Sequence, residues 1–203
     1  MEPFTIITGD DGTTRCWWGM EPEIYRTYHD TEWGMPVSDD HRLFEKLCLE
    51  GFQSGLSWLT ILNKRESFRE VFRGFDFDLV AEFTDGDVER LLTDARIIRH
   101  RGKIEATINN AGQAQTLREE FGSLAAYFWR FEPADEPQRP RLESKTSESV
   151  SMAKDLKKRG FRFFGPTTAY AFMQAMGIVN DHLPGCIAHP VVANARATYT
   201  RPV

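Results

Sequence analysis

Apolar residues recur at intervals of three and four along most of the chain, which is the spacing of helices that bury one face. The clearest stripe consists of Leu43, Phe44, Leu47 and Cys48. A second compact helix is predicted between Gly165 and Gly177, with Pro166 in its first turn. No alternating run of useful length predicts a strand. The pattern therefore predicts an all-α fold.

The periodic pattern covers residues 16–188 of the 203-residue chain and predicts a single helical domain of two interleaved lobes. Residues 1–15 are polar, contain glycine and lack sustained periodicity, so we expect a flexible leader. Residues 189–203 contain no motif that we can interpret, and we expect a flexible tail.

A tight hairpin between two helices is predicted just before Gly165. The first helix ends in basic residues followed by Gly160, and the short segment Phe161-Arg-Phe-Phe separates the two glycines. Glycine lets the backbone of such a hairpin come close to a partner.

Composition excludes some classes of protein. A net charge of −5 and 41% hydrophobic residues are ordinary for a globular protein, and no stretch approaches the length of a membrane span. The N-terminus lacks a signal-peptide pattern, so we expect a cytoplasmic protein. Three cysteines without an export signal argue against a disulfide framework.

A nucleic-acid-binding protein of this charge must concentrate its basic residues on one face. Two clusters qualify: Arg96, Arg99, Arg101 and Lys103 form one, and Lys157, Lys158 and Arg159 form the other. A solvated helix entrance is the alternative interpretation of the first cluster.

Two Cys/His pairs lie near the ends of the chain. Cys16 and His29 form the first pair, and His182 and Cys186, spaced as His-x3-Cys, form the second. Thiolate and imidazole ligands suit tetrahedral zinc, and four protein ligands leave no open position for water, so such a site would be structural. The alternative is two unrelated cysteines and two satisfied histidines, and His189 is one further imidazole that could compete.

Large aromatic residues gather between positions 17 and 33, where core packing is the alternative to a binding role. Glu50 is a second candidate, because it closes a helix in the apolar context Cys-Leu-Glu-Gly-Phe. An acid at a helix C-terminus opposes the helix dipole, and such a local conflict indicates function unless the acid is merely solvated or paired.

Several uncommon motifs occur together and in order. They are Tyr28-His-Asp-Thr-Glu-Trp-Gly, Cys48-Leu-Glu-Gly, Gly55-Leu-Ser-Trp, Arg99-His-Arg-Gly-Lys-Ile and Asn180-Asp-His-Leu-Pro-Gly-Cys. From about Cys16 to Cys186 the chain thereby resembles the 3-methyladenine DNA glycosylase I family. The resemblance implies a helix-hairpin-helix glycosylase fold in which structural zinc, bound by Cys16, His29, His182 and Cys186, joins the two ends of the chain.

The resemblance also implies the activity: flipping 3-methyladenine out of alkylated double-stranded DNA and hydrolysing its N-glycosidic bond, which leaves an abasic site. Glu50 is the implied base-reading and catalytic carboxylate. The implied base-binding rings are Tyr28, Trp58, Trp18, Tyr25 and Trp33. The implied DNA contacts are Gln53, Leu56, Arg99, Phe163, Phe164 and Gly165.

The helix from Gly165 to Gly177 contains no lysine that could form a Schiff base, which favours base release without strand cleavage. We expect the protein to act as a monomer without a membrane partner. The alternative function is a zinc-stabilised helix-hairpin-helix module that binds DNA without catalysis.

Overall fold

The computed structural model describes residues 5–134 and 144–203, and within these ranges most residues are helical. The helices are α1 (Glu23–Thr31), α2 (Asp40–Gln53), α3 (Trp58–Leu62), α4 (Arg65–Val71), α5 (Phe77–Ala81), α6 (Asp85–Thr93), α7 (Arg101–Phe121), α8 (Leu124–Trp129), α9 (Ser147–Lys158), α10 (Pro166–Ala175) and α11 (Ala188–Thr198). Short 3-10 helices span Trp17–Gly19 and Arg73–Phe75. The prediction of a helical fold is confirmed for most of the chain.

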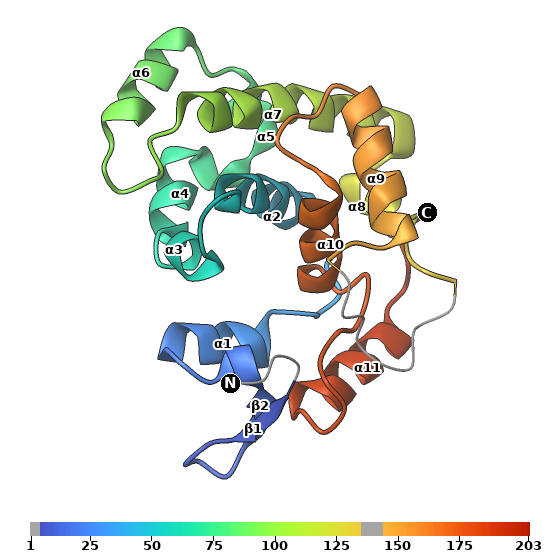
Figure 1. The fold of residues 1–203 in the computed structure, drawn as a ribbon. Helices are drawn as coiled ribbons and strands as arrows, with labels where there is room; N and C mark the ends of the chain where they lie inside the picture. The colour runs from blue at the N-terminus through green and yellow to red at the C-terminus, as the bar shows by residue number, and fades with distance from the viewer. Residues whose placement is uncertain (1–4, 135–143) are drawn as a thin grey trace.

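Helix α2 lies at the centre of the larger part of the fold, where it contacts α3, α7, α8 and α10 (Figure 1). Its predicted stripe is buried: Leu43 and Phe44 are fully inaccessible, and Leu47 and Cys48 nearly so. The Asp39 carboxylate caps the helix by accepting a hydrogen bond from the Arg42 amide. Because helices surround it, α2 holds its polar residues in fixed positions.

The N-terminal hairpin, α1 and α11 lie together, on the side of the molecule away from α6 and α7 (Figure 1). Strand β1 (Ile6–Thr8) pairs with β2 (Thr14–Cys16) in an antiparallel hairpin, with Ile6 opposite Cys16. The Ile187 amide donates a hydrogen bond to the Thr14 carbonyl, and α1 contacts α11. Residues from both ends can therefore share one site.

This arrangement corrects the predicted ends of the chain. Residues 5–15, expected to be a flexible leader, form most of the hairpin, and residues 1–4 lie outside the described part. The strands have three residues each, too few for alternation to be visible in the sequence. The expected flexible tail contains most of α11, whose buried Arg196 hydrogen-bonds the Gly177 carbonyl and pairs with Glu132.

Helix α10 ends where its sequence predicted. Gly177 has a φ of +73°, which favours glycine, and a Cβ atom built there would lie 2.5 Å from the Pro36 backbone nitrogen. The close approach lets the segment before α2 pack against the end of α10. The backbone that follows leads directly to His182.

Candidate functional site

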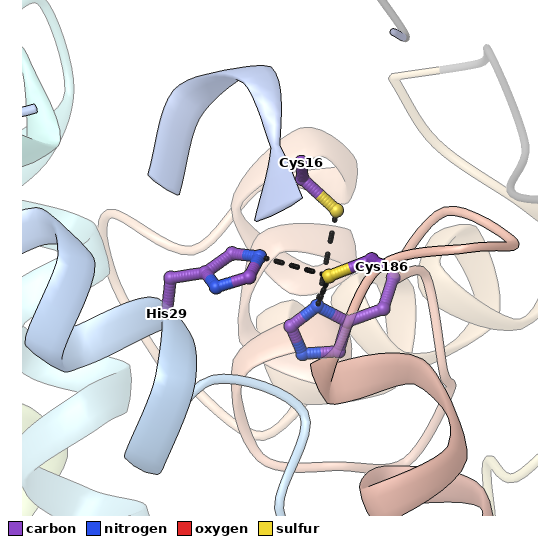
Figure 2. A group of neighbouring side chains, drawn as sticks. Cys16, His29 and Cys186 are labelled. Atoms are coloured by element: carbon purple, nitrogen blue, oxygen red, sulfur yellow. Dashed lines mark hydrogen bonds between the residues drawn. The ribbon is translucent and has the colours of Figure 1, made fainter. Parts of the chain in front are cut away.

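Four buried side chains from three separate elements form a cluster. Cys16 ends β2, His29 lies on α1, and His182 and Cys186 lie in the loop before α11. Their ligand atoms all lie within 4.8 Å of one another, and Figure 2 shows Cys16, His29 and Cys186 pointing toward a common centre. The group could hold a metal ion.

The distances in the cluster suit a tetrahedral ion. Cys186 Sγ lies 3.4 Å from His29 Nε2 and 3.7 Å from His182 Nδ1, and Cys16 Sγ lies 3.9 Å from His182 Nδ1. Ligands about 2.3 Å (sulfur) and about 2.05 Å (nitrogen) from a zinc ion would be separated by about 3.5 Å. The donor set therefore fits zinc with little adjustment.

Both imidazole rings are oriented by a second hydrogen bond. His182 donates from Nε2 to the Trp33 carbonyl at 2.9 Å, which directs Nδ1 to the cluster. His29 donates from Nδ1 to Asp30 at 2.8 Å, and the buried Arg15 guanidinium holds that carboxylate in turn. Such partners fix the tautomer and the direction of a metal-binding histidine.

The electrostatics of the cluster favour a thiolate. Hydrogen bonds from the Cys16 thiol and from both histidines lower the pKa of Cys186 well below its usual value, although burial opposes them. Burial lowers the pKa of His29, but its hydrogen bonds to Cys186 and Asp30 outweigh this and raise it overall. A deprotonated sulfur is the form that binds metal.

A pocket of about 290 Å³ opens beside the cluster. Its aromatic lining consists of Trp17, Trp18, Tyr25, Tyr28, Trp33 and Trp58, and its polar lining consists of Lys46, Glu50, Gln53, Gln174 and Asp181. The structure thus brings together all five rings predicted to bind a base, and places Glu50 among them. This combination of rings and a few polar groups is typical of a small-molecule site.

The Cys/His cluster and the pocket share a wall. The Trp18 ring lies 4.9 Å from the His29 ring and 4.9 Å from the Trp33 ring, measured between centroids. The Trp33 carbonyl accepts the hydrogen bond from His182 described above. A loss of order in the cluster would therefore reach two of the pocket's rings.

Glu50 is buried and paired, which the sequence did not show. Its carboxylate lies 2.7 Å from the Lys46 ammonium, one helical turn earlier on α2, and both side chains are nearly inaccessible. Lys46 also donates to the Tyr28 hydroxyl at 2.9 Å. The acid at the end of α2 is therefore held by a lysine rather than by solvent.

The C-terminus of α2 has a second cation. Lys103 of α7 is buried, and its ammonium donates to the carbonyls of Phe52 and Ser54 at 2.9 and 2.6 Å. Such bonds satisfy carbonyl groups that a helix end leaves open. Lys103, predicted as part of a basic surface cluster, instead fixes the loop that follows Glu50.

We expect Lys103→Met to lower the free energy of unfolding by about 1–3 kcal/mol, because two carbonyl groups lose a buried donor. Urea denaturation measures this change. Lys64→Met is the matched control, since Lys64 also donates to two carbonyls, those of Ala95 and Arg96, but at an exposed site where water can replace it. Equal effects of the two substitutions would contradict this role of Lys103.

The loop after α2 and the start of α10 border a shallow groove beside the pocket. Residues 53–56 line one side, and Thr167, Thr168 and Ala171 line the other. Gln53 is half-buried at the pocket rim, and Leu56 exposes 41% of its surface. The predicted contacts Gln53 and Leu56 therefore border the groove beside the pocket.

The turn between α9 and α10 lies beside the Arg99 segment. Phe163, at a φ of +55°, exposes 42% of its surface, and its ring lies 6.0 Å from the His100 ring. The buried Asn110 side chain holds this turn through hydrogen bonds to both backbone groups of Arg162. Arg99 and Gly165 are both exposed.

The ring of Phe164, one of the predicted DNA contacts, does not face the surface. Its side chain is buried and packs against Phe172 with ring centroids 5.8 Å apart. The positive φ at Phe163 turns one ring outward while the next faces the core. The Phe164 ring therefore belongs to the core.

Lys46, Asp181 and Gln174 line the pocket but are not among the predicted site residues. Asp181 accepts hydrogen bonds from Tyr170 and Gln174 and is buried. Only Lys46 had a readable signal, since a lysine four residues before an acid can form an ion pair on a helix.

Among the described residues, no helix combines the length and apolarity needed to cross a membrane.

Known proteins resemble the chain over most of its length. A family model described as methyladenine glycosylase matches residues 17–189. DNA-3-methyladenine glycosylase 1 of Escherichia coli (strain K12) is 46% identical over 182 residues, covering 87% of this chain and 97% of that protein. DNA-3-methyladenine glycosylase of Haemophilus influenzae is 48% identical over 180 residues, covering 86% and 97%.

Solved structures agree with the sequence relatives. A crystal structure of a 3-methyladenine DNA glycosylase I superposes with a TM-score of 0.82 at 47% identity, covering 87% of this chain and 100% of the other. The Staphylococcus aureus enzyme, in a structure described as the basis of 3-methyladenine recognition, gives 0.82 at 35% identity and covers 87% and 96%. These findings and the matched residues show that the chain belongs to the methyladenine glycosylase family.

Proposed function

We propose that the protein removes 3-methyladenine from alkylated double-stranded DNA by hydrolysing the N-glycosidic bond. The observation that carries the proposal is the pocket itself. It is lined by the buried Glu50 and by the five aromatic residues that were predicted to bind the base. Family membership supplies the reaction class, and the relatives named above carry the same activity in their names. A backbone-binding module would have no use for an acid inside an aromatic pocket.

The departure of this base needs little chemical assistance from the protein. 3-Methyladenine carries positive charge while it is joined to the sugar, so it departs as a neutral purine once it takes the electron pair of the glycosidic bond. Water then adds to the sugar carbon, and one proton is released. The pocket needs to hold the flipped base and to prefer its charged form, for which aromatic faces contribute about 1–2 kcal/mol each.

Glu50 reads the base edge in this proposal. Its carboxylate can accept hydrogen bonds from the purine, and it lines the same pocket as Tyr28 and Trp58, on which we propose that the base stacks. We infer from this placement that Glu50 takes part in the reaction.

The Cys16, His29, His182 and Cys186 group would hold zinc in a structural role. With four protein ligands, the ion has no position for a reacting water. What the ion supplies is a tie between β2, α1 and the loop before α11, and through Trp18 and Trp33 it steadies the pocket wall.

We further propose that α9, the turn after it and α10 form a helix-hairpin-helix unit that binds the DNA backbone. The support is the sharp turn, the exposed Phe163 and Gly165, and the clamp by Asn110. We infer that a monomer acts on DNA in the cytoplasm.

Methylated duplex DNA tests the proposal. After incubation with the protein, the strands should remain intact until mild alkali cleaves them at abasic sites, since base release without strand cleavage is predicted. Binding with no alkali-sensitive sites would support the DNA-binding module instead. Strand breaks before the alkali step would refute the absence of lyase activity.

Arg99, Lys157 and Lys158 are exposed and should contact phosphates rather than bases. Changing each to Gln should weaken DNA binding equally for all sequences and lower the slope of log affinity against log salt by about one for each phosphate that is no longer neutralised. Fluorescence anisotropy at several salt concentrations measures the slope. The exposed Lys145, which precedes the N-cap of α9, provides the control Lys145→Gln. A slope equal to that of the control would show that the three residues point away from DNA.

A further inference from the structure

Lys46 is a buried cation inside a pocket that is proposed to select a cationic base. Its side chain is almost inaccessible, and it lines the pocket together with the rings and Glu50. An ammonium group in an aromatic pocket costs free energy unless its donors are satisfied. A role for Lys46 must therefore be sought in what it contacts.

The Lys46 ammonium contacts the three residues that are most strongly predicted to bind the base. Nζ lies 2.7 Å from Glu50 Oε1, 2.9 Å from the Tyr28 hydroxyl and 3.3 Å from the centroid of the Trp58 ring. A lysine has three N–H donors and no acceptor, so these three contacts account for all its donors. Tyr28 comes from α1, Glu50 from α2 and Trp58 from α3.

Each contact fixes a different property of the pocket. The ion pair sets the direction of the Glu50 carboxylate and offsets its charge. The hydrogen bond makes the Tyr28 hydroxyl an acceptor, so its own hydrogen points away from Lys46. The ammonium on the face of Trp58 holds that ring at its tilt of 44° to Tyr28.

We propose that Lys46 is a positioning residue of the base pocket, which ties Glu50, Tyr28 and Trp58 into one preset arrangement before the base enters. The inference rests on the proposed function. Preset groups avoid reorganisation when the base is bound, and displacements of about 1 Å can cost about 100-fold in rate.

A second consequence concerns charge. Because the Lys46 ammonium offsets the Glu50 carboxylate, preference for a cationic base rests on the aromatic faces, and Glu50 acts through the geometry of its acceptor oxygens. Lys46 would then act largely through Glu50. Substitution of Lys46 should therefore reduce the rate of base release less when Glu50 has already been substituted.

A double-mutant cycle tests this dependence. Single-turnover release of 3-methyladenine from methylated duplex DNA is measured for wild type, Lys46→Met, Glu50→Gln and the double variant. Lys46→Met should slow release by about 10- to 100-fold. In the Glu50→Gln background the same change should cost less than about threefold. If the effects of the two single substitutions multiply in the double variant, the inference is wrong. It is also wrong if Lys46→Met leaves the rate unchanged.

The double variant also controls for misfolding that an unpaired buried charge would cause. It removes both charges and so leaves no unpaired buried ion, whereas Lys46→Met alone strands the Glu50 carboxylate. Circular dichroism establishes folding of each variant. The exposed Lys145→Met is the control for the loss of one positive charge.

The alkaline side of the pH profile gives an independent readout. Burial lowers the pKa of Lys46 from its usual 10.5, although Glu50 opposes this, so the ammonium is lost below pH 10.5 as the pH rises. The other charged or titratable groups around it are Tyr25, Tyr28, Glu32, Arg42, Glu45, Glu50, Arg65, Arg69 and Asp181. Burial raises the pKa of both tyrosines and lowers that of Lys46, and the Lys46→Met variant distinguishes the lysine from them. The wild-type rate of base release, after subtraction of the uncatalysed release, should therefore decrease over the pH range in which Lys46 loses its proton. The rate of Lys46→Met should not decrease over this pH range.

A readout without activity separates the two proposals. The indole N–H signal of Trp58, assigned with Trp58→Phe, should broaden in Lys46→Met because the ammonium no longer holds the ring. If wild type releases no base, the proposed function fails, and this signal still decides whether Lys46 positions the ring. If wild type is active and both the signal and the rate are unchanged in Lys46→Met, only the inference about Lys46 fails.

Discussion

Glu50→Gln should slow single-turnover release of 3-methyladenine by about 10- to 100-fold, because a hydrogen bond to a charged acceptor contributes about 1.5–3 kcal/mol. Glutamine keeps the size of the side chain and one acceptor oxygen, so the substitution removes charge and leaves packing intact. Rapid-quench measurement of free base under enzyme excess gives the rate.

The control for this result lies on the same helix. Glu45 is also buried on α2, but it pairs with Arg69 and does not line the aromatic pocket. Glu45→Gln removes a comparable ion pair and should leave the rate of release near the wild-type value. If both substitutions slowed release equally, Glu50 would matter only through the stability of α2.

His182→Ala should abolish metal binding and lower the free energy of unfolding by at least about 3 kcal/mol, since loss of a metal site is among the few causes of large effects. For a chain of this size, that corresponds to a fall in Tm of roughly 6–12 °C. The substitution also removes the hydrogen bond to the Trp33 carbonyl, so the pocket wall should loosen. Metal analysis and calorimetry on the same samples check both parts.

His189 offers a matched control. It lies seven positions further along the chain, is only half-buried and is not part of the Cys/His cluster. His189→Ala should keep a full equivalent of zinc and a Tm close to that of wild type. A metal-free wild-type protein with unchanged Tm would refute the structural role of the ion.

Local patterns were enough to predict the helices and several of their ends. The stripe on α2 and the signals around α10 depend on residues within a few positions of one another, and the structure confirms both. The four Cys/His residues also meet, as their residue types and the His-x3-Cys spacing indicated and as the resemblance implied.

Tertiary contacts explain what the sequence could not predict. Phe163 and Phe164 are the same residue type, and only the backbone angle at Phe163 decides which ring is exposed. Lys46 reads as one half of a helical ion pair, but its contact with Trp58 requires α3 to fold back onto α2. Residues 188–198 form a helix whose buried Arg196 pairs with Glu132, a partner far away in the sequence.

The identity of the released base tests the central claim most directly. Duplex DNA treated with a methylating agent carries several modified purines, and chromatography with mass detection can identify each free base after incubation with the protein. We expect 3-methyladenine as the main product, formed in a one-to-one ratio with new abasic sites and strongly reduced in Glu50→Gln. Release of unmodified purines in preference to 3-methyladenine, or no released base from a folded and DNA-bound protein, would contradict the proposed function.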